Sequence, residues 1–315
     1  MSNTCQHIAT YAQAAKRDPT RTTTLRNRFV KDVNRRFNKL KRDIRTTIVT
    51  NDAFGLNIQT NTAAGPNAFS FNTSAQKVDA FMEWLKTQID DGILEIKYAN
   101  QIGAAAQQPW TNMYIQDSYA RGQARAVYEL NKLGIKVPPI EQTGGIRAAM
   151  GGPFHMDRVG LLYSRTFQEL KGITAAMDSQ ISRVLSQAMA DGDGPLKIAR
   201  KLIATIDGKG TAVSKLAIKD SLGRFIPAQR RAQTMARTEM IRAHHQATIQ
   251  EYENWGVEGI KVKAEWSTAG DDRVCQQCSA LEGNVYSLEE IRPMIPLHPN
   301  CRCIALPLLE KPKKN

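Results

Sequence analysis

The organisation of this chain is decided by residues 266–303, which read WSTAGDDRVCQQCSALEGNVYSLEEIRPMIPLHPNCRC. The stretch holds four of the five cysteines, and a histidine precedes the second cysteine pair by three residues. Thiolate and imidazole are the ligands that zinc prefers, and a CxxC turn brings two sulfurs to one tetrahedral ion. A second pair of ligands about twenty residues further on is typical of structural zinc sites. The predicted metal ligands are Cys275, Cys278, His298, Cys301 and Cys303.

These five candidates compete for the four positions of a tetrahedral zinc ion. On an extended strand Cys301 and Cys303 point to the same side, because side chains alternate, and His298 lies in the turn that leads into that strand. The ion is therefore held by four sulfurs, or by three sulfurs and the imidazole. The alternative is a set of structural sulfurs or disulfides, which is typical of short secreted domains. We predict a closed, structural zinc site without an open catalytic position.

The composition places the chain among globular proteins. Its 315 residues suggest about two domains, and 42% of them are hydrophobic. No apolar run approaches the roughly 20 residues that a transmembrane helix needs, so we expect no membrane partner during assembly. The N-terminal stretch MSNTCQHIATYAQAAKRD is too polar for the core of a signal peptide. A reducing cytoplasm is therefore the expected environment.

The charge is concentrated near the N-terminus. The net charge is +13, and residues 16–45 carry twelve basic and three acidic residues. Apolar residues recur there at three- and four-residue steps, which predicts an amphipathic helix over about 20–48 with its apolar face docked and its cationic face outward. That face either grips an anionic partner, such as nucleic acid or an acidic protein, or is only solvated. The predicted contact residues are Arg28, Lys31, Arg35, Arg36, Lys39 and Arg42.

The remaining patterns divide the chain into a helical body and a small C-terminal lobe. Residues 1–135 form a helical region with a long Asn- and Thr-rich loop at 51–74, and the Gly- and Pro-rich residues 136–155 form a hinge. Residues 156–258 are helical again. Residues 259–315 begin with period-two alternation, typical of a strand, and end in a basic tail. The predicted fold class is mainly α (α+β), with the C-terminal α+β lobe stapled by zinc.

Four motifs in this order resemble the phage Mu F-like minor head morphogenesis family. They are GPLKIARKLI, MARTEMIRAHHQA, EWSTAGDDRVCQQCSALEG and HPNCRC, and they span about residues 193–306. ARTE alone is a weak signal, but its combination with DxRVCxxC and HPNCRC is fairly specific. Residues 1–150 carry no matching motif. The family positions matched here include Arg237, Glu239, Trp266, Asp272, Arg273 and Gly283.

The resemblance implies a minor capsid protein of a tailed bacteriophage that acts in head assembly, DNA packaging or DNA ejection. Such a protein is made in the host cytoplasm and built into the virion, in the capsid interior or at the portal vertex. The implied partners are the portal protein, the scaffold or the major capsid protein, with double-stranded DNA as a further candidate. The basic helix is compatible with this role, because a capsid interior is filled with packaged phosphate.

Two charged residues of the ARTE motif have no obvious partner in sequence. Arg237 and Glu239 stand two apart on a helix and do not face each other, so each needs another contact. We expect one of them to bridge the helix to the zinc-bearing lobe through Asp272 or Arg273. The alternative is that both are ordinary exposed charges.

The other motif residues have predicted structural roles. We expect Trp266 to pack the lobe, Asp272 to cap or salt-bridge its turn, and Gly283 to supply a backbone φ that the turn requires. His244 and His245 point about 100° apart on one helix, so they are left out of the metal site. A lobe of about 45 residues has little core of its own, and a metal therefore contributes much of its folding energy.

No catalytic residue is predicted, and three other activities are weaker interpretations. An HNH-type metal-dependent nuclease also uses paired cysteine knuckles, but no histidine lies on a strand between the two pairs. A zinc-ribbon DNA-binding protein would have its salt-dependent affinity centred on the C-terminal lobe. An ADP-ribosyltransferase is suggested only by the RTE triplet, without that family's other elements.

Overall fold

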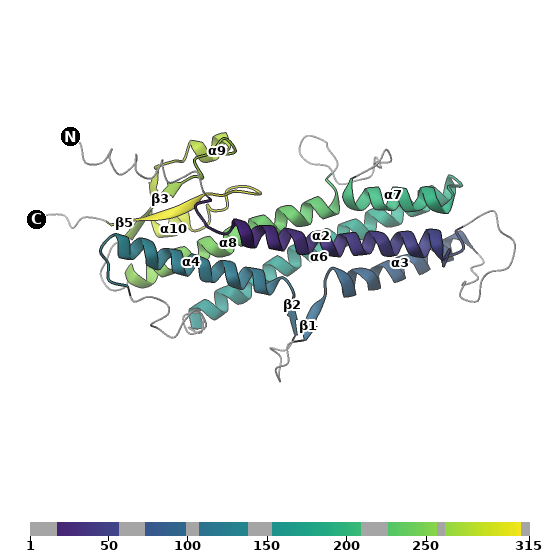
Figure 1. Ribbon diagram of the computed structural model, residues 1–315, viewed down its shortest axis with the longest axis horizontal. Helices are drawn as coiled ribbons and strands as arrows, with labels where there is room; N and C mark the ends of the chain where they lie inside the picture. The colour runs from purple at the N-terminus through teal and green to yellow at the C-terminus, as the bar shows by residue number, and fades with distance from the viewer. Residues whose placement is uncertain are drawn as a thin grey trace, which may run out of the picture. The chain divides into compact units, whose positions relative to one another are not determined.

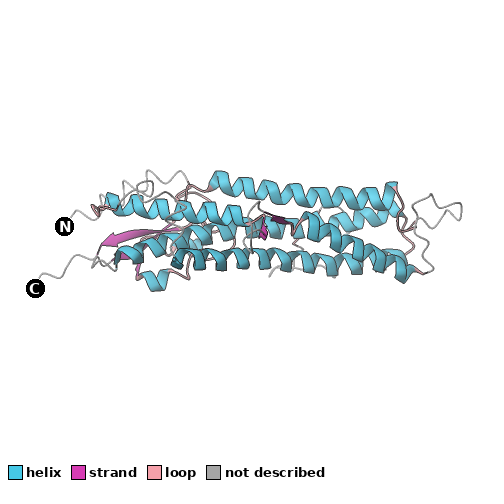
Figure 2. Cartoon of the chain, turned by 90° about the horizontal axis from the view of Figure 1, so that it is seen from below, coloured by secondary structure: helices cyan, strands magenta, loops and turns pink. Residues whose placement is uncertain are grey.

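The chain is mainly helical. The computed structural model describes residues 18–56, 73–98, 107–137, 153–208, 226–256 and 262–309. Helices dominate these ranges (Figure 1, Figure 2). The long helices are α2 (Thr23–Arg45), α3 (Ser74–Gly92), α4 (Asn112–Lys132), α6 (Pro153–Ala190), α7 (Pro195–Asp207) and α8 (Ala228–Gly256). None of the described helices is long and apolar enough to span a membrane.

The strands are short and fall into two groups. β1 (Ile96–Tyr98) and β2 (Gln107–Pro109) pair antiparallel. The C-terminal lobe holds a three-stranded antiparallel sheet in the order β4-β3-β5, with two single-turn helices. These elements are β3 (Val262–Ser267), α9 (Gln276–Ser279), β4 (Val285–Tyr286), α10 (Leu288–Ile291) and β5 (Ile304–Leu309). The predicted fold class, a helical body with a small α+β lobe, is confirmed.

The chain forms two compact units, each assembled from separate stretches of sequence. Unit 1 comprises Met1–Phe29, Thr111–Thr166 and Met235–Asn315, and unit 2 comprises Val30–Trp110 and Phe167–Thr234. Three of the four boundaries between them fall inside α2, α6 and α8, and the fourth lies between β2 and α4.

Two predicted features fall largely outside the described residues. Most of the predicted loop at 51–74 lies there, as does most of the predicted hinge at 136–155. The predicted division of the chain at that hinge stays a prediction.

Helix α2 confirms the predicted amphipathic helix, slightly shorter than expected. It is followed by a π-helical turn, η1 (Thr46–Thr50). The apolar residues picked out by their spacing are all at most 3% exposed: Leu25, Phe29, Val33, Phe37, Leu40 and Ile44. Before the helix, the Asp18 carboxylate accepts from the backbone N–H of Thr22 (3.1 Å) and from Arg26 (2.6 Å). These bonds satisfy donors near a helix start that would otherwise lack a partner.

The outward cationic face is smaller than predicted, because Arg36 does not belong to it. Its guanidinium lies 4.2 Å from the ring centroid of Trp110 and donates to Glu95 and to the Gly92 carbonyl, each at 2.6 Å. Arg36 therefore holds unit 2 together, and its side chain is only 9% exposed. The other five predicted contact residues are exposed: Arg28, Lys31, Arg35, Lys39 and Arg42.

Unit 2 also ties α2 to α8 and to the end of α7. The amide oxygen of Asn34 accepts from Gln229 (2.8 Å) and Gln233 (2.6 Å). Lys41 donates to the Asp207 carboxylate at 2.9 Å, and both side chains are at most 15% exposed. Helix α7 begins at Pro195, where the proline occupies a first-turn position that does not need an N–H.

Unit 1 brings α4 and α8 so close together that one position between them accepts only glycine. A Cβ atom on Gly122 would lie 2.2 Å from the His244 carbonyl oxygen and 2.8 Å from Cβ of Ala247. The Gly122 carbonyl in turn accepts from the Thr248 hydroxyl at 3.2 Å. The backbones of α4 and α8 can therefore approach this closely only because Gly122 has no side chain.

We predict that Gly122→Ala lowers the free energy of unfolding by about 1–3 kcal/mol, because the added methyl group must push two helix backbones apart. Gly160→Ala is the matched control, since Gly160 is an exposed helical glycine of α6 and a Cβ atom added there would meet no atom within 4 Å. Helix propensity makes that control neutral or slightly stabilising. Chemical denaturation followed by circular dichroism measures both, and equal stability of the two variants would contradict the close approach.

Candidate metal centre

The C-terminal lobe is built around Trp266 and docks on α8. Trp266 is fully buried in β3, where it pairs with Ala305 of β5, as its predicted packing role requires. From α8, the Tyr252 hydroxyl donates to the Ala305 carbonyl at 3.3 Å. His245 and Gln246 hydrogen-bond through Nε2 to the carbonyl oxygens at the end of α10, those of Ile291 and Arg292, both at 3.1 Å. The sheet and the helix therefore share one core.

The first cysteine pair lies on a short turn between β3 and β4. Cys275 caps the single-turn helix α9, and its Sγ accepts from the backbone N–H of Cys278 at 3.3 Å. The chain then returns to the sheet at Gly283, whose φ is +77° and whose N–H donates to the Trp266 carbonyl at 2.9 Å. The prediction that Gly283 supplies a special φ is confirmed, since only glycine adopts this backbone region without strain.

The second group of ligands follows α10 in a tight turn. The N–H of Cys301 donates to the His298 carbonyl at 3.1 Å, and Asn300 between them has a φ of +62°. Strand β5 begins at Ile304, so Cys301 and Cys303 precede the strand in which we expected them. Both sulfurs nevertheless reach the same group of side chains, as the predicted alternation required.

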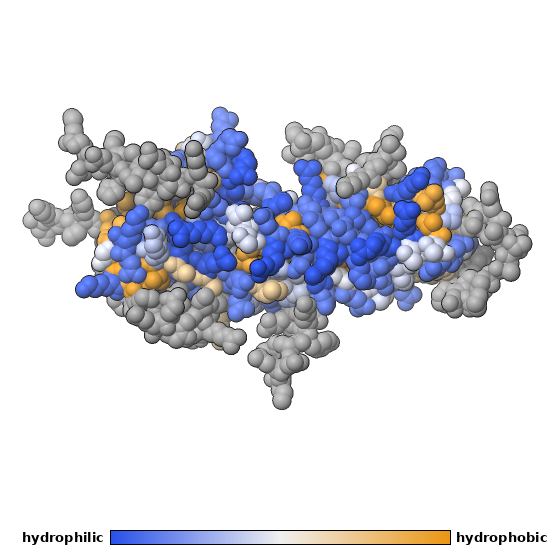
Figure 3. All heavy atoms as spheres, viewed as in Figure 1, coloured by the Kyte–Doolittle hydropathy of each residue, from blue (hydrophilic) through white to orange (hydrophobic). Residues whose placement is uncertain are grey.

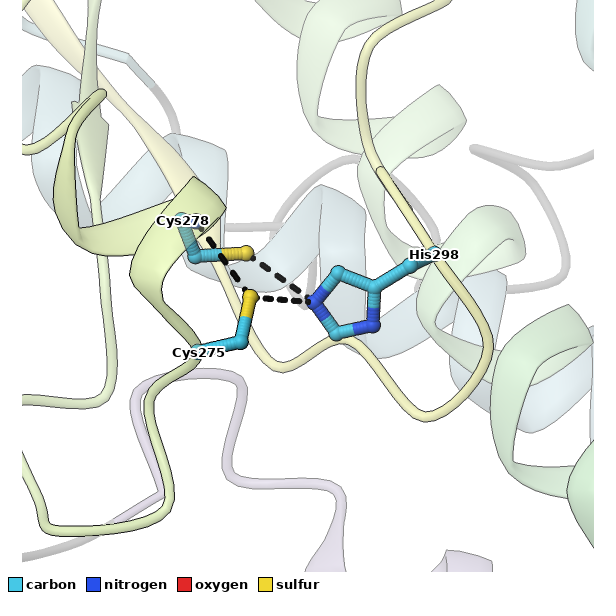
Figure 4. A group of neighbouring side chains, drawn as sticks. All are labelled: Cys275, Cys278 and His298. Atoms are coloured by element: carbon cyan, nitrogen blue, oxygen red, sulfur yellow. Dashed lines mark hydrogen bonds between the residues drawn. The ribbon is translucent and has the colours of Figure 1, made fainter. Parts of the chain in front are cut away.

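The five predicted ligands come together in two overlapping groups. In the first, the Sγ atoms of Cys275 and Cys278 each lie 3.1 Å from Nε2 of His298 (Figure 4). In the second, Sγ of Cys278 lies 4.0 Å from Sγ of Cys301, and Cys303 completes the group. Within each group the ligand atoms lie within 4.8 Å of one another. Two ligands of a tetrahedral zinc ion stand about 3.5–3.8 Å apart, so both groups have dimensions that fit such an ion.

Cys278 belongs to both groups, so any set of four ligands that contains one whole group includes it. The four cysteines are free thiols, so the disulfide alternative does not describe this lobe. Cys278, Cys301 and Cys303 are buried, and Cys275 and His298 are half-buried. The cluster therefore lies at the lobe's margin, with its sulfurs mostly inside.

Hydrogen bonding prepares His298 to act as a ligand. Its Nδ1 lies 2.9 Å from the Pro299 carbonyl and donates to it, which leaves the lone pair of Nε2 directed to the two sulfurs. Metal-binding histidines commonly fix their tautomer through a bond of this kind. Burial alone would lower the pKa of His298, but the Pro299 carbonyl and the neighbouring thiolates raise it.

The sulfurs lie so close together that their thiolate forms repel one another unless a cation is bound. Burial and the neighbouring Cys301 raise the pKa of Cys278 to about 12. The thiol of Cys303 donates to Cys301, which lowers the pKa of Cys301 to about 5 and raises that of Cys303. Only some of the thiols can ionise together without a cation, whereas a bound metal ion stabilises all its ligands as thiolates.

An ion pair joins the two ligand-bearing segments. Arg302 donates from Nη1 and Nη2 to the two carboxylate oxygens of Asp271, at 2.7 and 2.5 Å. Arg273 donates to the same carboxylate at 2.8 Å, and the two arginines hold the pKa of Asp271 well below its usual range. We expected Asp272 to cap or salt-bridge this turn, but Asp272 is exposed and Asp271 has the contacts.

The ARTE motif contacts the lobe through a different residue from those predicted. Glu239 is 4% exposed and accepts from Arg165 of α6 (3.1 Å) and from Arg242 (3.2 Å), while Arg237 is half-buried. The bridge from α8 to the lobe is made by Thr238, whose hydroxyl oxygen accepts from the N–H of Asn300 at 3.1 Å. The motif thus supports the turn that carries His298 and Cys301.

Sequence reasoning missed a buried polar cluster between α4, α6 and α8. The Tyr119 hydroxyl lies 2.9 Å from Nδ1 of His155, and Gln123 donates to Glu251 at 3.0 Å. Burial raises the pKa values of Tyr119, to about 12, and of Glu251, and lowers that of His155. Burial therefore disfavours the charged form of each of these three groups. Helical spacing alone could not separate these residues from other polar positions.

The geometry defines a helical protein with a small lobe in which four cysteines and one histidine can hold a metal ion. Residues 179–306 match the sequence model of the family described as Phage Mu protein F like protein, which confirms the resemblance seen in the motifs. The match covers less than half of the chain, and it contains both ligand groups and α8. No curated protein and no solved structure matches the chain significantly.

We predict that Cys278→Ser abolishes stable metal binding, because its sulfur belongs to both ligand groups. Cys5→Ser, which removes the cysteine outside the motif, is the control and should leave the metal content unchanged. Metal analysis of the purified full chain measures both. Wild-type metal content in Cys278→Ser would contradict the assignment of the ligands.

His244 and His245 are buried in α8 and stay outside the metal cluster. Burial lowers the pKa of His244 to about 3 and that of His245 to about 4. In the unfolded chain both have pKa values near 6.5, so only the unfolded state takes up protons between about pH 6.5 and 4. Their neutral forms therefore contribute stability that is complete above about pH 6.5 and is lost as the pH falls towards 4.

We predict that the double variant His244→Gln, His245→Gln flattens this pH dependence. Each imidazole contributes a slope of at most about 1.4 kcal/mol per pH unit to the free energy of unfolding. Denaturant titrations of wild type and variant at pH 7.5, 6.5 and 5.5 measure the difference in slope. The metal ligands are the same in both proteins, so their contribution cancels, and identical slopes would contradict the role of the two histidines.

Proposed function

We propose that this protein is a head morphogenesis protein of a tailed bacteriophage and acts without turnover as a minor component of the virion. The observation that carries the proposal is the family match over residues 179–306, which contains the whole metal cluster and the helix that supports it. Five candidate ligands form the cluster, which is more than the four positions of a tetrahedral ion, whereas a catalytic zinc site keeps one position open. The chemistry of the site therefore favours a structural role.

The ion that fits the cluster best is zinc. Soft sulfur ligands with one imidazole, at tetrahedral spacing, are the donor set that zinc takes in structural sites. A bound ion would link the turn of Cys275 and Cys278 to the turn of His298, Cys301 and Cys303. The lobe has few residues, so this link would contribute a large share of its stability.

The exposed face of α2 is the proposed contact for a polyanion. The five exposed residues among the predicted contacts follow one side of the helix, and hydrophilic residues cover the visible side of α2 in Figure 3. Arg35 and Lys39 form ion pairs within the helix, with Asp32 and Asp43, but their side chains remain 68% and 60% exposed. Such exposed pairs are weak, so both cations can exchange partners. Packaged double-stranded DNA or an acidic surface of the portal, scaffold or major capsid protein fits this face.

In the virion, the proposed position is the capsid interior or the portal vertex, with the protein entering during procapsid assembly in the host cytoplasm. From there it would act in packaging or ejection of DNA. We expect the protein to cofractionate with the portal protein in purified procapsids and mature particles, in few copies per particle. Quantitative mass spectrometry of both particle types tests this, and absence from both would reject the assignment.

If the exposed face of α2 binds a polyanion, the loss of DNA affinity on mutation depends on where basic residues are removed and not only on how many. Replacing Arg28, Lys31 and Arg42 by glutamine should weaken binding to duplex DNA and reduce the slope of log affinity against log salt by about 0.9 per lost contact. The control variant replaces Lys171, Arg183 and Arg200 of α6 and α7, which are also exposed, and loses the same charge. Equal effects of the two triple variants would show that net charge alone drives binding.

A further inference from the structure

We propose that Asp271 is a positioning residue of the metal centre, whose carboxylate clamps the two ligand-bearing segments into the spacing that the ion requires. This inference rests on the proposed metal site and adds a residue that is not a ligand. Asp271 stands four positions before Cys275, and its partner Arg302 stands between Cys301 and Cys303. One ion pair therefore joins the segment of the first cysteine pair directly to that of the second.

The ion pair between Arg302 and Asp271 has the bidentate geometry of strong arginine–carboxylate pairs. Both terminal nitrogens of Arg302 donate to the two separate oxygens of Asp271, at 2.7 and 2.5 Å. This parallel arrangement restricts the relative orientation of the two segments as well as their separation. The side chains are 16% exposed for Arg302 and 25% for Asp271, so water competes with the contact less than at an open surface.

Asp271 is coupled to the first cysteine pair through its own backbone. Its carbonyl accepts from the N–H of Val274 at 3.1 Å, and its Oδ1 accepts from the N–H of Arg273 at 3.2 Å. The residues up to Cys275 therefore form a constrained turn rather than a free linker. A displacement of the Asp271 carboxylate would carry Cys275 with it.

Arg302 is coupled to the second cysteine pair as Asp271 is to the first, because it lies between Cys301 and Cys303 in the chain. Cys301 and Cys303 on either side of it both belong to the ligand group with Cys278, while its own side chain reaches Asp271 instead. Fixing Arg302 thus fixes the peptide units that carry both sulfurs. Arg273 shares the carboxylate but is 73% exposed, so we expect its contribution to be small.

Groups that hold metal ligands in place affect affinity even though they do not touch the ion. Loss of such a partner typically weakens metal binding by about 10–100-fold. We expect Asp271→Asn to weaken zinc binding by at least about 10-fold and to speed zinc release by a similar factor. The asparagine keeps the size of the side chain but loses the bidentate, charged contact.

The experiment measures the zinc affinity of the full chain by competition with a chromophoric chelator, and zinc release after excess chelator is added. Asp272→Asn is the matched control, because it removes the same charge from the neighbouring, exposed position, and it should stay within about 2-fold of wild type. Arg302→Lys, which keeps the charge but loses the fork of donors, should resemble Asp271→Asn. The double variant Asp271→Asn, Arg302→Lys should bind zinc no more weakly than either single variant, because both changes remove the same contact.

The possible results distinguish failure of the Asp271 clamp from failure of the metal site. A wild-type chain that binds no zinc overturns the site and the clamp together. A zinc-binding wild type with Asp271→Asn at unchanged affinity and release rate overturns the clamp alone. A variant with lower thermal stability of the metal-free chain but unchanged zinc affinity does the same, since it shows a contact that is only structural. Should Asp271→Asn fail to fold, Arg302→Lys decides by the same measurements.

Discussion

Docking of the C-terminal lobe on α8 is the interaction on which the rest of unit 1 depends. His245 and Gln246 bond to the carbonyls at the end of α10, and Thr238 accepts from the backbone before Cys301. These contacts lie along one helix, so α8 sets the positions of the second ligand segment and of the sheet. Because α4 approaches α8 at Gly122, the same helix also forms the core of the helical part of this unit.

The ion pair of Asp271 links two turns of the lobe, whose own core is small, and an ion bound by the cysteines and His298 would add a second link. A lobe with a three-stranded sheet and two single-turn helices buries little apolar surface of its own. Its turns need fixed links, which the sulfurs, the imidazole and the arginine–carboxylate pair can supply. This requirement explains why the ligands, Trp266, Gly283 and the segment around Asp271 are concentrated within about forty residues.

Much of the fold and of the site followed from local patterns. The burial of the α2 stripe, the φ of Gly283 and the meeting of the cysteines with His298 were all predictable, because each depends on spacing or on the geometry of a single turn. The contacts of charged side chains were not predictable in the same way. Arg36 lies against Trp110, and Glu239 pairs with Arg165, partners that are far away in sequence.

The sequence by itself determined the helical body, the candidate metal ligands and the similarity of residues 179–306 to the Phage Mu protein F like family, since periodicity and ligand chemistry are properties of short segments. Only the tertiary structure decided which neighbouring residue makes the contact at each motif: Thr238 rather than Glu239, and Asp271 rather than Asp272. The physical reason is that a polar side chain bonds to whatever the fold brings within about 3 Å, and residues one apart point in different directions. A motif therefore locates a contact, and packing selects the atom that makes it.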